Sequence, residues 1–165
     1  MTQPWSKDVL FSSAKQDWST PKDLFTSLDS EFSFDLDACA TSANAKTLNF
    51  IGPEEDALTV DWSERGARIF CNPPYGRGIG EWVEKAYKTS LSGPTVVVLI
   101  FARTDTKWWQ DWASRAAEIR FISGRVHFER GGVTGPATAP SAVLVFSEEY
   151  RVPLIKHVQL PRGND

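Results

Sequence analysis

The chain has 165 residues and a formal net charge of −3 at neutral pH, with 41% hydrophobic and 24% charged residues. This balance is typical of one globular domain. No apolar run approaches the roughly 20 residues that span a bilayer, and the first residues lack the pattern of a secretory signal. We therefore expect a cytoplasmic protein without a membrane partner. Cys39 and Cys71 have no Cys or His at metal-ligand spacing, which argues against a zinc site.

The charge is distributed unevenly along the chain. Residues 1–64 contain 4 Lys or Arg and 12 Asp or Glu, whereas residues 65–165 contain 14 and 9. This asymmetry is compatible with a basic face for nucleic acid and equally with a mixed, solvated surface.

Hydrophobic periodicity predicts helices alternating with strands. Residues 1–17 are polar and look like an arm. A helix begins at Thr20-Pro21, where Thr20 is a candidate N-cap and Pro21 fits the first helical position, and it ends near Ser30. The later predicted elements are a strand over 32–36, a strand over 67–71, a helix over 81–90, a buried strand over 95–101, a helix over 105–117, strands over 118–122 and 125–129, a loop over 131–140 and a strand over 142–146.

This order predicts one α/β domain over residues 18–150, between the arm (1–17) and a C-terminal tail (151–165). Its sheet is doubly wound and mostly parallel, with an antiparallel edge. In such sheets ligands bind at the carboxyl ends of the strands. Three segments follow predicted strands at these ends, and we expect them to converge on one crevice: 37–40, 72–75 and 102–105.

The segment Asn72-Pro73-Pro74-Tyr75 stops a short strand, because consecutive prolines cannot continue a central strand. It also suits transfer of a methyl group to a planar amine such as the amino group of adenine. The Asn72 side-chain oxygen and the Pro73 carbonyl can accept the two amino hydrogens, and Tyr75 offers a ring on which a base stacks. A base in a duplex reaches such a pocket only when it is flipped out. The alternative is a strand-ending turn with an incidental tyrosine.

Two aspartates are candidates for binding a methyl donor. Asp37 ends the first strand, where backbone amides can approach a ligand, because the following residues are small: Ala38, Cys39 and Ala40. Asp56 could accept from the donor adenine while Leu58 packs on its ring. The alternative is that both are surface residues. A Gly-x-Gly-x-x-Gly motif is missing, which argues against a dinucleotide.

Basic and aromatic residues near strand ends and in the late hairpin are candidates for DNA contacts. These are Arg77, Arg103, Lys107, Trp108, Trp109, Arg125 and Arg130. Trp108 and Trp112 lie four residues apart on one helical face, so core packing is the alternative, and we favour it for Trp112.

These motifs, taken together and in this order, resemble those of the phage-type DNA N-6-adenine methyltransferases, the Dam family. The resemblance runs from about residue 11 to 147. It rests on Trp18-Ser19-Thr20-Pro21, EFSFDLDACA (31–40), Asn44-Ala45-Lys46, Asp56-Ala57-Leu58, FCNPPYGR (70–77), ARTDTKWW (102–109), RFISGRVHF (120–128) and 140–146.

The resemblance implies a Rossmann-like fold that binds S-adenosylmethionine and acts on double-stranded DNA, with GATC as a first guess for the site. Trp18 and Thr20-Pro21 match the element that closes over the donor, and Asp56 matches a contact to its adenine. Only 31 residues separate Cys39 from Cys71, too few for two strand–helix units, so we expect a fold shortened between its first and fourth strands. Asn44 is then the candidate for the donor ribose.

The family also suggests that DNA is read by loops, at residues 76–80 and 124–140, and that methylation protects phage DNA against restriction. Other functions use the same four-residue motif, namely methylation of RNA or of a glutamine amide in a protein. A non-catalytic DNA-binding module is a further alternative, although the motif is intact here.

Overall fold

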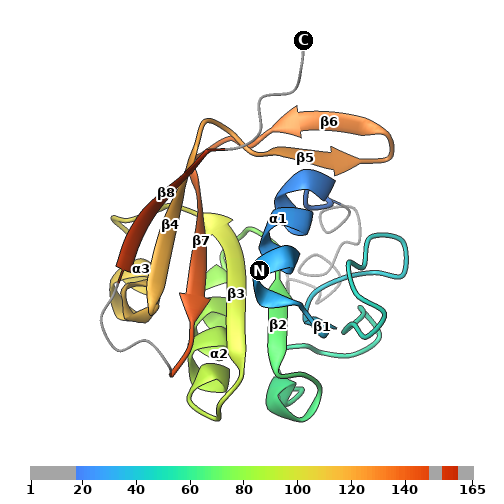
Figure 1. Cartoon of the computed structure of the whole chain (residues 1–165), viewed down its shortest axis with the longest axis vertical. Coiled ribbons are helices and arrows are strands. Elements are labelled where there is room, and N and C mark those ends of the chain that lie inside the picture. The colour runs from blue at the N-terminus through green and yellow to red at the C-terminus, as the bar shows by residue number, and fades with distance from the viewer. Residues whose placement is uncertain (1–17, 149–153, 160–165) are drawn as a thin grey trace, which may run out of the picture.

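The computed structural model describes residues 18–148 and 154–159, and the predicted arm (1–17) lies outside them. Within these residues the main sheet has six strands (Figure 1). Their order across the sheet is β1 (Leu36–Asp37), β2 (Arg68–Cys71), β3 (Thr95–Phe101), β7 (Ser141–Phe146), β4 (Glu118–Ser123) and β8 (Leu154–Gln159). A hairpin of β5 (His127–Arg130) and β6 (Val133–Pro136) forms a second sheet.

The main sheet is mostly parallel, as predicted. Strands β1, β2 and β3 run parallel to one another, as do β4 and β8, while β7 is antiparallel to both of its neighbours. The prediction of an antiparallel edge is wrong, because β7 lies between β3 and β4. All six β7 residues are buried. A position inside the sheet gives their backbone N–H and C=O groups hydrogen-bond partners on both neighbouring strands. Strand β8 falls within the expected C-terminal tail and was not predicted.

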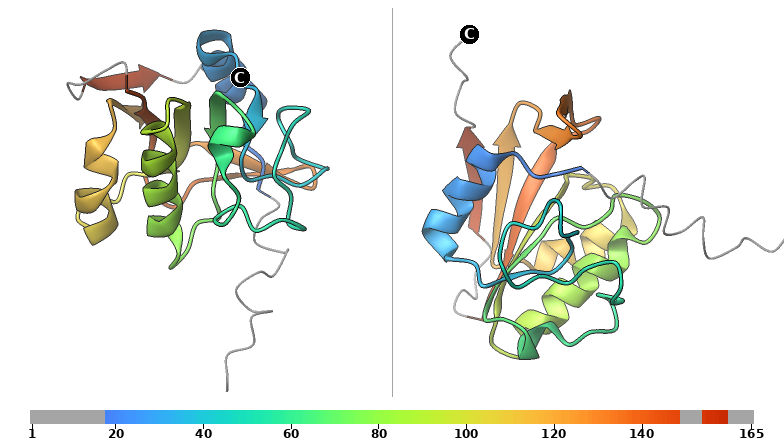
Figure 2. Two further views of the ribbon diagram at one scale, coloured as in Figure 1. Left: turned by 90° about the horizontal axis from the view of Figure 1, so that it is seen from below. Right: turned by 90° about the vertical axis from the view of Figure 1, so that its right-hand side faces the viewer.

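Helices cover both faces of this sheet (Figure 2). Helices α2 (Ile79–Ser90) and α3 (Lys107–Asp111) cover one face, and α1 (Lys22–Phe32) covers the other. The β3 residues 96–100 are fully buried between these layers, as their continuous apolar run predicts. Among the described residues, no helix has the length and apolarity needed to cross a membrane.

Several boundaries differ from the prediction. Helix α1 continues to Phe32 and is closed by Ser33, whose left-handed backbone (φ 53°) lets its N–H donate to the Asp29 carbonyl. The strand predicted over 32–36 therefore begins only at Leu36. The helix predicted over 105–117 is split into α3 and a 3₁₀ helix, η4 (Ala113–Arg115). The loop predicted over 131–140 contains β6, because Gly131 and Gly132 adopt the positive φ values of a tight hairpin turn.

The 30-residue stretch 38–67, between β1 and β2, contains turns and one 3₁₀ helix, η3 (Trp62–Glu64), and no named strand. Trp62 is fully buried, and its indole N–H donates to the Ala57 carbonyl at 2.8 Å. This contact fixes the irregular stretch against the core. Strand β1 consequently forms one edge of the sheet, and its carboxyl end opens into a long turn.

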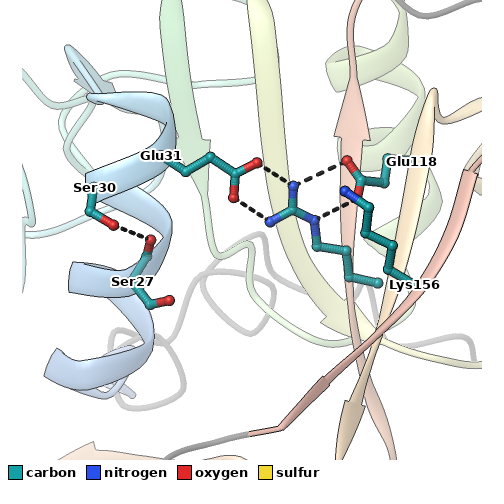
Figure 3. Close-up of polar contacts among 6 residues, drawn as sticks. Ser27, Ser30, Glu31, Glu118 and Lys156 are labelled. Atoms are coloured by element: carbon teal, nitrogen blue, oxygen red, sulfur yellow. Dashed lines mark hydrogen bonds and ion pairs between the residues drawn. The ribbon is translucent and has the colours of Figure 1, made fainter.

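A charged cluster ties α1 to β4 and β8 (Figure 3). The Arg120 side chain is only 8% exposed; its guanidinium donates twice to Glu31 at 2.6 Å and also to Glu118 at 2.9 and 3.1 Å. Lys156 of β8 pairs with Glu118 at 2.7 Å. The hydrogen bond from Arg120 holds the pKa of Glu31 below its ordinary value. The cluster thus links the helix that precedes β1 to the opposite edge of the sheet.

Candidate active site

A cavity of about 350 Å³ lies at the carboxyl ends of β1, β2 and β3. Two of the three segments expected to converge, 37–40 and 72–75, line it, and β3 contributes Phe101. The described lining residues are Trp18, Ser19, Thr20, Asp37, Cys39, Ala40, Thr41, Asn44, Lys46, Phe70, Asn72, Pro73, Pro74, Tyr75, Phe101, Phe128, Arg130, Gly135, Pro136, Ala137 and Thr138. The predicted donor and catalytic segments therefore share one space.

The motif tyrosine is held by hydrogen bonds and ring contacts. The Tyr75 hydroxyl lies 3.0 Å from Asn72 Oδ1 and 3.1 Å from the Leu99 carbonyl oxygen, so its single proton has two acceptors. Burial raises the pKa of Tyr75 well above its ordinary value, which keeps the hydroxyl protonated. The Tyr75 ring stacks on Phe101 with 4.2 Å between centroids, and the Phe128 ring meets it edge-on at 6.0 Å. One ring face is therefore supported from behind.

Asp37 is the one carboxylate among the described lining residues. It is 3% exposed, and its two oxygens accept from the backbone N–H groups of Cys39 (3.3 Å) and Lys46 (3.0 Å), which folds the chain after β1 back toward the cavity. Burial outweighs these hydrogen bonds and raises the pKa of Asp37 to about 6. A buried carboxylate with a raised pKa favours a cationic ligand, because a nearby positive charge stabilises the ionised form.

The hairpin of β5 and β6 supplies a wall that the sequence did not reveal. Ser19 and Glu129 exchange backbone hydrogen bonds of 2.7 and 3.1 Å, which brings the segment before α1 alongside β5. The Arg130 guanidinium lies 5.9 Å from the centroid of the Trp18 ring. The Trp18 ring in turn comes within 3.5 Å of the position that a Cβ on Gly135 would take. Residues 18–20 and the hairpin therefore close the same side of the cavity.

Comparisons with known proteins agree with this arrangement. The profile of the DNA N-6-adenine-methyltransferase (Dam) family matches residues 8–161. This chain belongs to the Dam family. It is 34% identical over 140 residues to the DNA N-6-adenine-methyltransferase of Haemophilus phage HP1 (strain HP1c1), covering 81% of this chain and 80% of that protein. A 63-residue stretch is 40% identical to YfdM of Escherichia coli (strain K12), a protein named as a methyltransferase, and covers 35% of this chain and 69% of YfdM.

Not every donor residue expected from the Dam resemblance reaches the cavity. Ala38 is fully buried. Neither Ala38 nor Pro21 is among the residues that line the cavity. Asp56 and Leu58 also lie outside it; Asp56 is exposed and accepts from the Leu58 N–H at 3.0 Å within a turn. Their contact with the donor stays a prediction. Conversely, Lys46 lines the cavity, and only its place in the Asn-Ala-Lys motif drew attention to it.

The predicted DNA contacts are spread over three places in this Dam family member. Arg130 lines the first cavity, whereas Arg77, Arg103 and Trp108 line a second one. Lys107 and Arg125 are exposed outside both, and Lys107 pairs with a carboxylate on its own helix. The prediction of a DNA contact at Trp109 is wrong. Its side chain is 5% exposed and stacks on Phe121 in the core.

The second cavity has a volume of about 450 Å³ and adjoins the first. Tyr75 and Phe101, whose rings stack on each other, line both cavities, and we refer to this pair as the partition. Trp112, favoured as a core residue, is partly buried against the core. Within residues 18–148 and 154–159, no group of three or more His, Cys, Asp or Glu residues is arranged to hold a metal ion.

Proposed function

We propose that this chain transfers a methyl group from S-adenosylmethionine to the exocyclic N6 amino group of an adenine flipped out of double-stranded DNA. Membership of the Dam family supports DNA adenine methylation in general. The observation that carries the more specific proposal is the shared cavity, which joins the motif Asn72–Tyr75 to the buried carboxylate of Asp37.

The residues of the first cavity fit the implied donor. Its volume of about 350 Å³ lies within the usual range for small-molecule sites. S-adenosylmethionine supplies a methyl group on a positively charged sulfur, together with an ammonium, a carboxylate and an adenosine. We assign the cationic groups to Asp37 and the carboxylate to Lys46 and Arg130, whose charges complement them. Trp18 and Thr20 close over the amino-acid end.

The motif residues bind and orient the target base. Asn72 Oδ1 and the Pro73 carbonyl accept the two amino hydrogens of adenine, which favours a more pyramidal nitrogen with an available lone pair. The Tyr75 hydroxyl keeps a partner in this state, because it can donate to the Leu99 carbonyl and leave Asn72 Oδ1 to the base. Phe101 occupies one face of the Tyr75 ring, so we assign the opposite face to the adenine. Positioning then supplies most of the rate.

We further propose that the fold is a Rossmann-like sheet in which the irregular stretch 38–67 replaces the strands between β1 and β2. Asn44, which lines the cavity, is our candidate for the donor ribose. The loop 76–80 and the hairpin segment 124–140 are our candidates for reading DNA. The site GATC, protection against restriction and a cytoplasmic location stay predictions.

The test is transfer of labelled methyl groups to duplex DNA, RNA and a glutamine-containing peptide, with sequencing of the modified bases. We expect N6-methyladenine in duplex DNA. Asn72→Ala lowers kcat about 100-fold or more, the usual cost of removing one acceptor or donor at a reacting centre, and leaves donor affinity within about threefold. Asn72→Asp keeps the oxygen acceptors and retains more activity than Asn72→Ala.

Each alternative function corresponds to a different result of this assay. Transfer to RNA or peptide alone supports the other uses of the motif, and donor binding without transfer supports a non-catalytic module. Unchanged transfer by Asn72→Ala refutes the assigned role of Asn72.

A further inference from the structure

We propose that the second cavity binds the nucleotide next to the flipped adenine on the same DNA strand. Arg77 and Arg103 hold its phosphodiester oxygens, and Trp108 stacks on its base. This subsite rests on the proposed function, because it serves the same DNA substrate. It assigns a ligand to a cavity that the methyl-transfer chemistry does not use.

The position of the cavity connects it to the target strand. The Phe101 ring contacts both neighbours, with its centroid 4.2 Å from that of the Tyr75 ring and 5.9 Å from the Arg103 guanidinium. Arg103 therefore lies beside the ring pair to which we assign the target base and lines the adjoining cavity. Adjacent nucleotides are joined by a single phosphodiester, so a strand that delivers its adenine to Asn72 must pass the rim of this partition. Gly76, which lines the second cavity, has no other group within 4 Å of a hypothetical Cβ. This part of the lining therefore leaves room for a ligand.

The charges of the two cavities differ in the way that their ligands differ. The described lining of the second cavity contains two arginines and no carboxylate, whereas the first contains the carboxylate of Asp37 together with Lys46 and Arg130. Among the described residues, neither Arg77 nor Arg103 forms an ion pair with a carboxylate. Guanidinium groups of this kind bind phosphate through paired hydrogen bonds. The second cavity thus suits an anion, and the first suits a donor that carries both positive and negative groups.

Trp108 is placed as a fixed stacking platform. A Cβ on Gly80 would lie 2.9 Å from the Trp108 Cβ, so α2 and α3 approach each other closely at this point. The start of α3 is fixed as well, because Thr106 caps it by accepting from the Trp109 N–H. The Trp108 side chain is half-buried and still lines the cavity. A tryptophan held in this way loses little freedom when a base stacks on it.

The first experiment compares Arg77→Gln and Arg103→Gln with Arg68→Gln. Arg68 is an exposed arginine at the amino end of β2, away from both cavities, so it is the matched control. We expect each cavity variant to raise the KM for unmethylated plasmid DNA about five- to tenfold and to reduce the slope of log affinity against log salt by about one. The Kd for S-adenosylmethionine changes less than about twofold. Cavity variants that match Arg68→Gln in both measurements overturn the phosphate assignment.

The second experiment tests the base contact of Trp108. It uses duplexes that contain the methylated site found by sequencing, intact or with one abasic position directly 5′ or 3′ of the adenine. For the wild type, we expect one of the two abasic duplexes to lower kcat/KM about tenfold, the size expected for one stacked base. On intact DNA, Trp108→Leu lowers kcat/KM by a similar factor. On the abasic duplex that slows the wild type, the variant has the same kcat/KM as it has on intact DNA. An equal loss on intact and abasic DNA refutes stacking.

These results separate the subsite from the proposed function. A wild-type chain that methylates no DNA refutes the proposed function itself. A wild type that methylates DNA, with cavity variants equal to the control, refutes only the subsite. Donor affinity reports whether each variant keeps its fold, because the donor site lies in the other cavity.

Discussion

The raised pKa of Asp37 makes donor binding depend on pH. Asp37 is 3% exposed, and burial raises the pKa of its carboxyl group from 3.8 to about 6. The folded protein therefore holds this proton more tightly than the unfolded chain, and its stability falls as pH rises through this window, by about 3 kcal/mol in all. A cationic donor offsets the free-energy cost of ionising the buried carboxyl group, because its positive charge stabilises the carboxylate. Donor affinity consequently rises as pH rises toward 6 and levels off above it.

The size of the effect follows from the two pKa values. If the donor returns the pKa of Asp37 to its ordinary range, affinity is about tenfold weaker near pH 5 than near pH 7, and close to one proton is released on binding near pH 5. Isothermal titration calorimetry with S-adenosylmethionine measures both quantities. The described lining contains no histidine and no second carboxylate to titrate in this range.

Two variants isolate Asp37 in this measurement. Asp37→Asn cannot ionise, so its donor affinity is lower at neutral pH and flat between about pH 5 and 7. Asp23→Asn changes an exposed aspartate of α1 outside the cavity and keeps the wild-type pH profile. A flat wild-type profile, or the same slope in Asp37→Asn, would refute the assignment of the donor cation to Asp37.

Two further predictions concern the charged cluster and the hairpin wall. Arg120→Met lowers the free energy of unfolding by about 3 kcal/mol in urea titrations, because the buried carboxylate of Glu118 loses its main partner. Adding Glu31→Leu and Glu118→Leu to Arg120→Met recovers most of this loss. If Arg120→Met alone is as stable as the wild type, the reasoning is contradicted. Gly135→Val displaces the Trp18 ring and weakens donor binding several-fold. Gly135→Ala changes it little, because its Cβ meets that ring at an ordinary 3.5 Å.

The sequence predicted those parts of the site that depend on local pattern. The continuous apolar run of β3 indicated a strand covered on both faces, and the two prolines after Cys71 marked the end of β2. Parallel strands end at the same edge of a sheet. This rule was sufficient to place Asp37 and Asn72 in one cavity.

The remaining parts depend on contacts between distant segments. The hairpin wall forms because Ser19 pairs with Glu129, and no local periodicity reports such a pairing. Strand β8 was missed because its register against β4 is set by non-local pairing, with Ile119 opposite Ile155. Trp109 and Trp108 are neighbours in sequence, and only the turn of α3 decides that one enters the core while the other lines a cavity.

In the proposed function, the partition of Tyr75 and Phe101 borders both the donor site and the phosphate site. A guanidinium beside Asp37 would lower the pKa of that carboxyl and neutralise its attraction for a cation. Arg77 and Arg103 line the second cavity and not the first, and burial outweighs the charge of Lys46 in setting the pKa of Asp37. Arg130 shares the first cavity but lies over Trp18. In the proposed function, the partition supports the target base, and the arginines that we assign to phosphate line the other cavity.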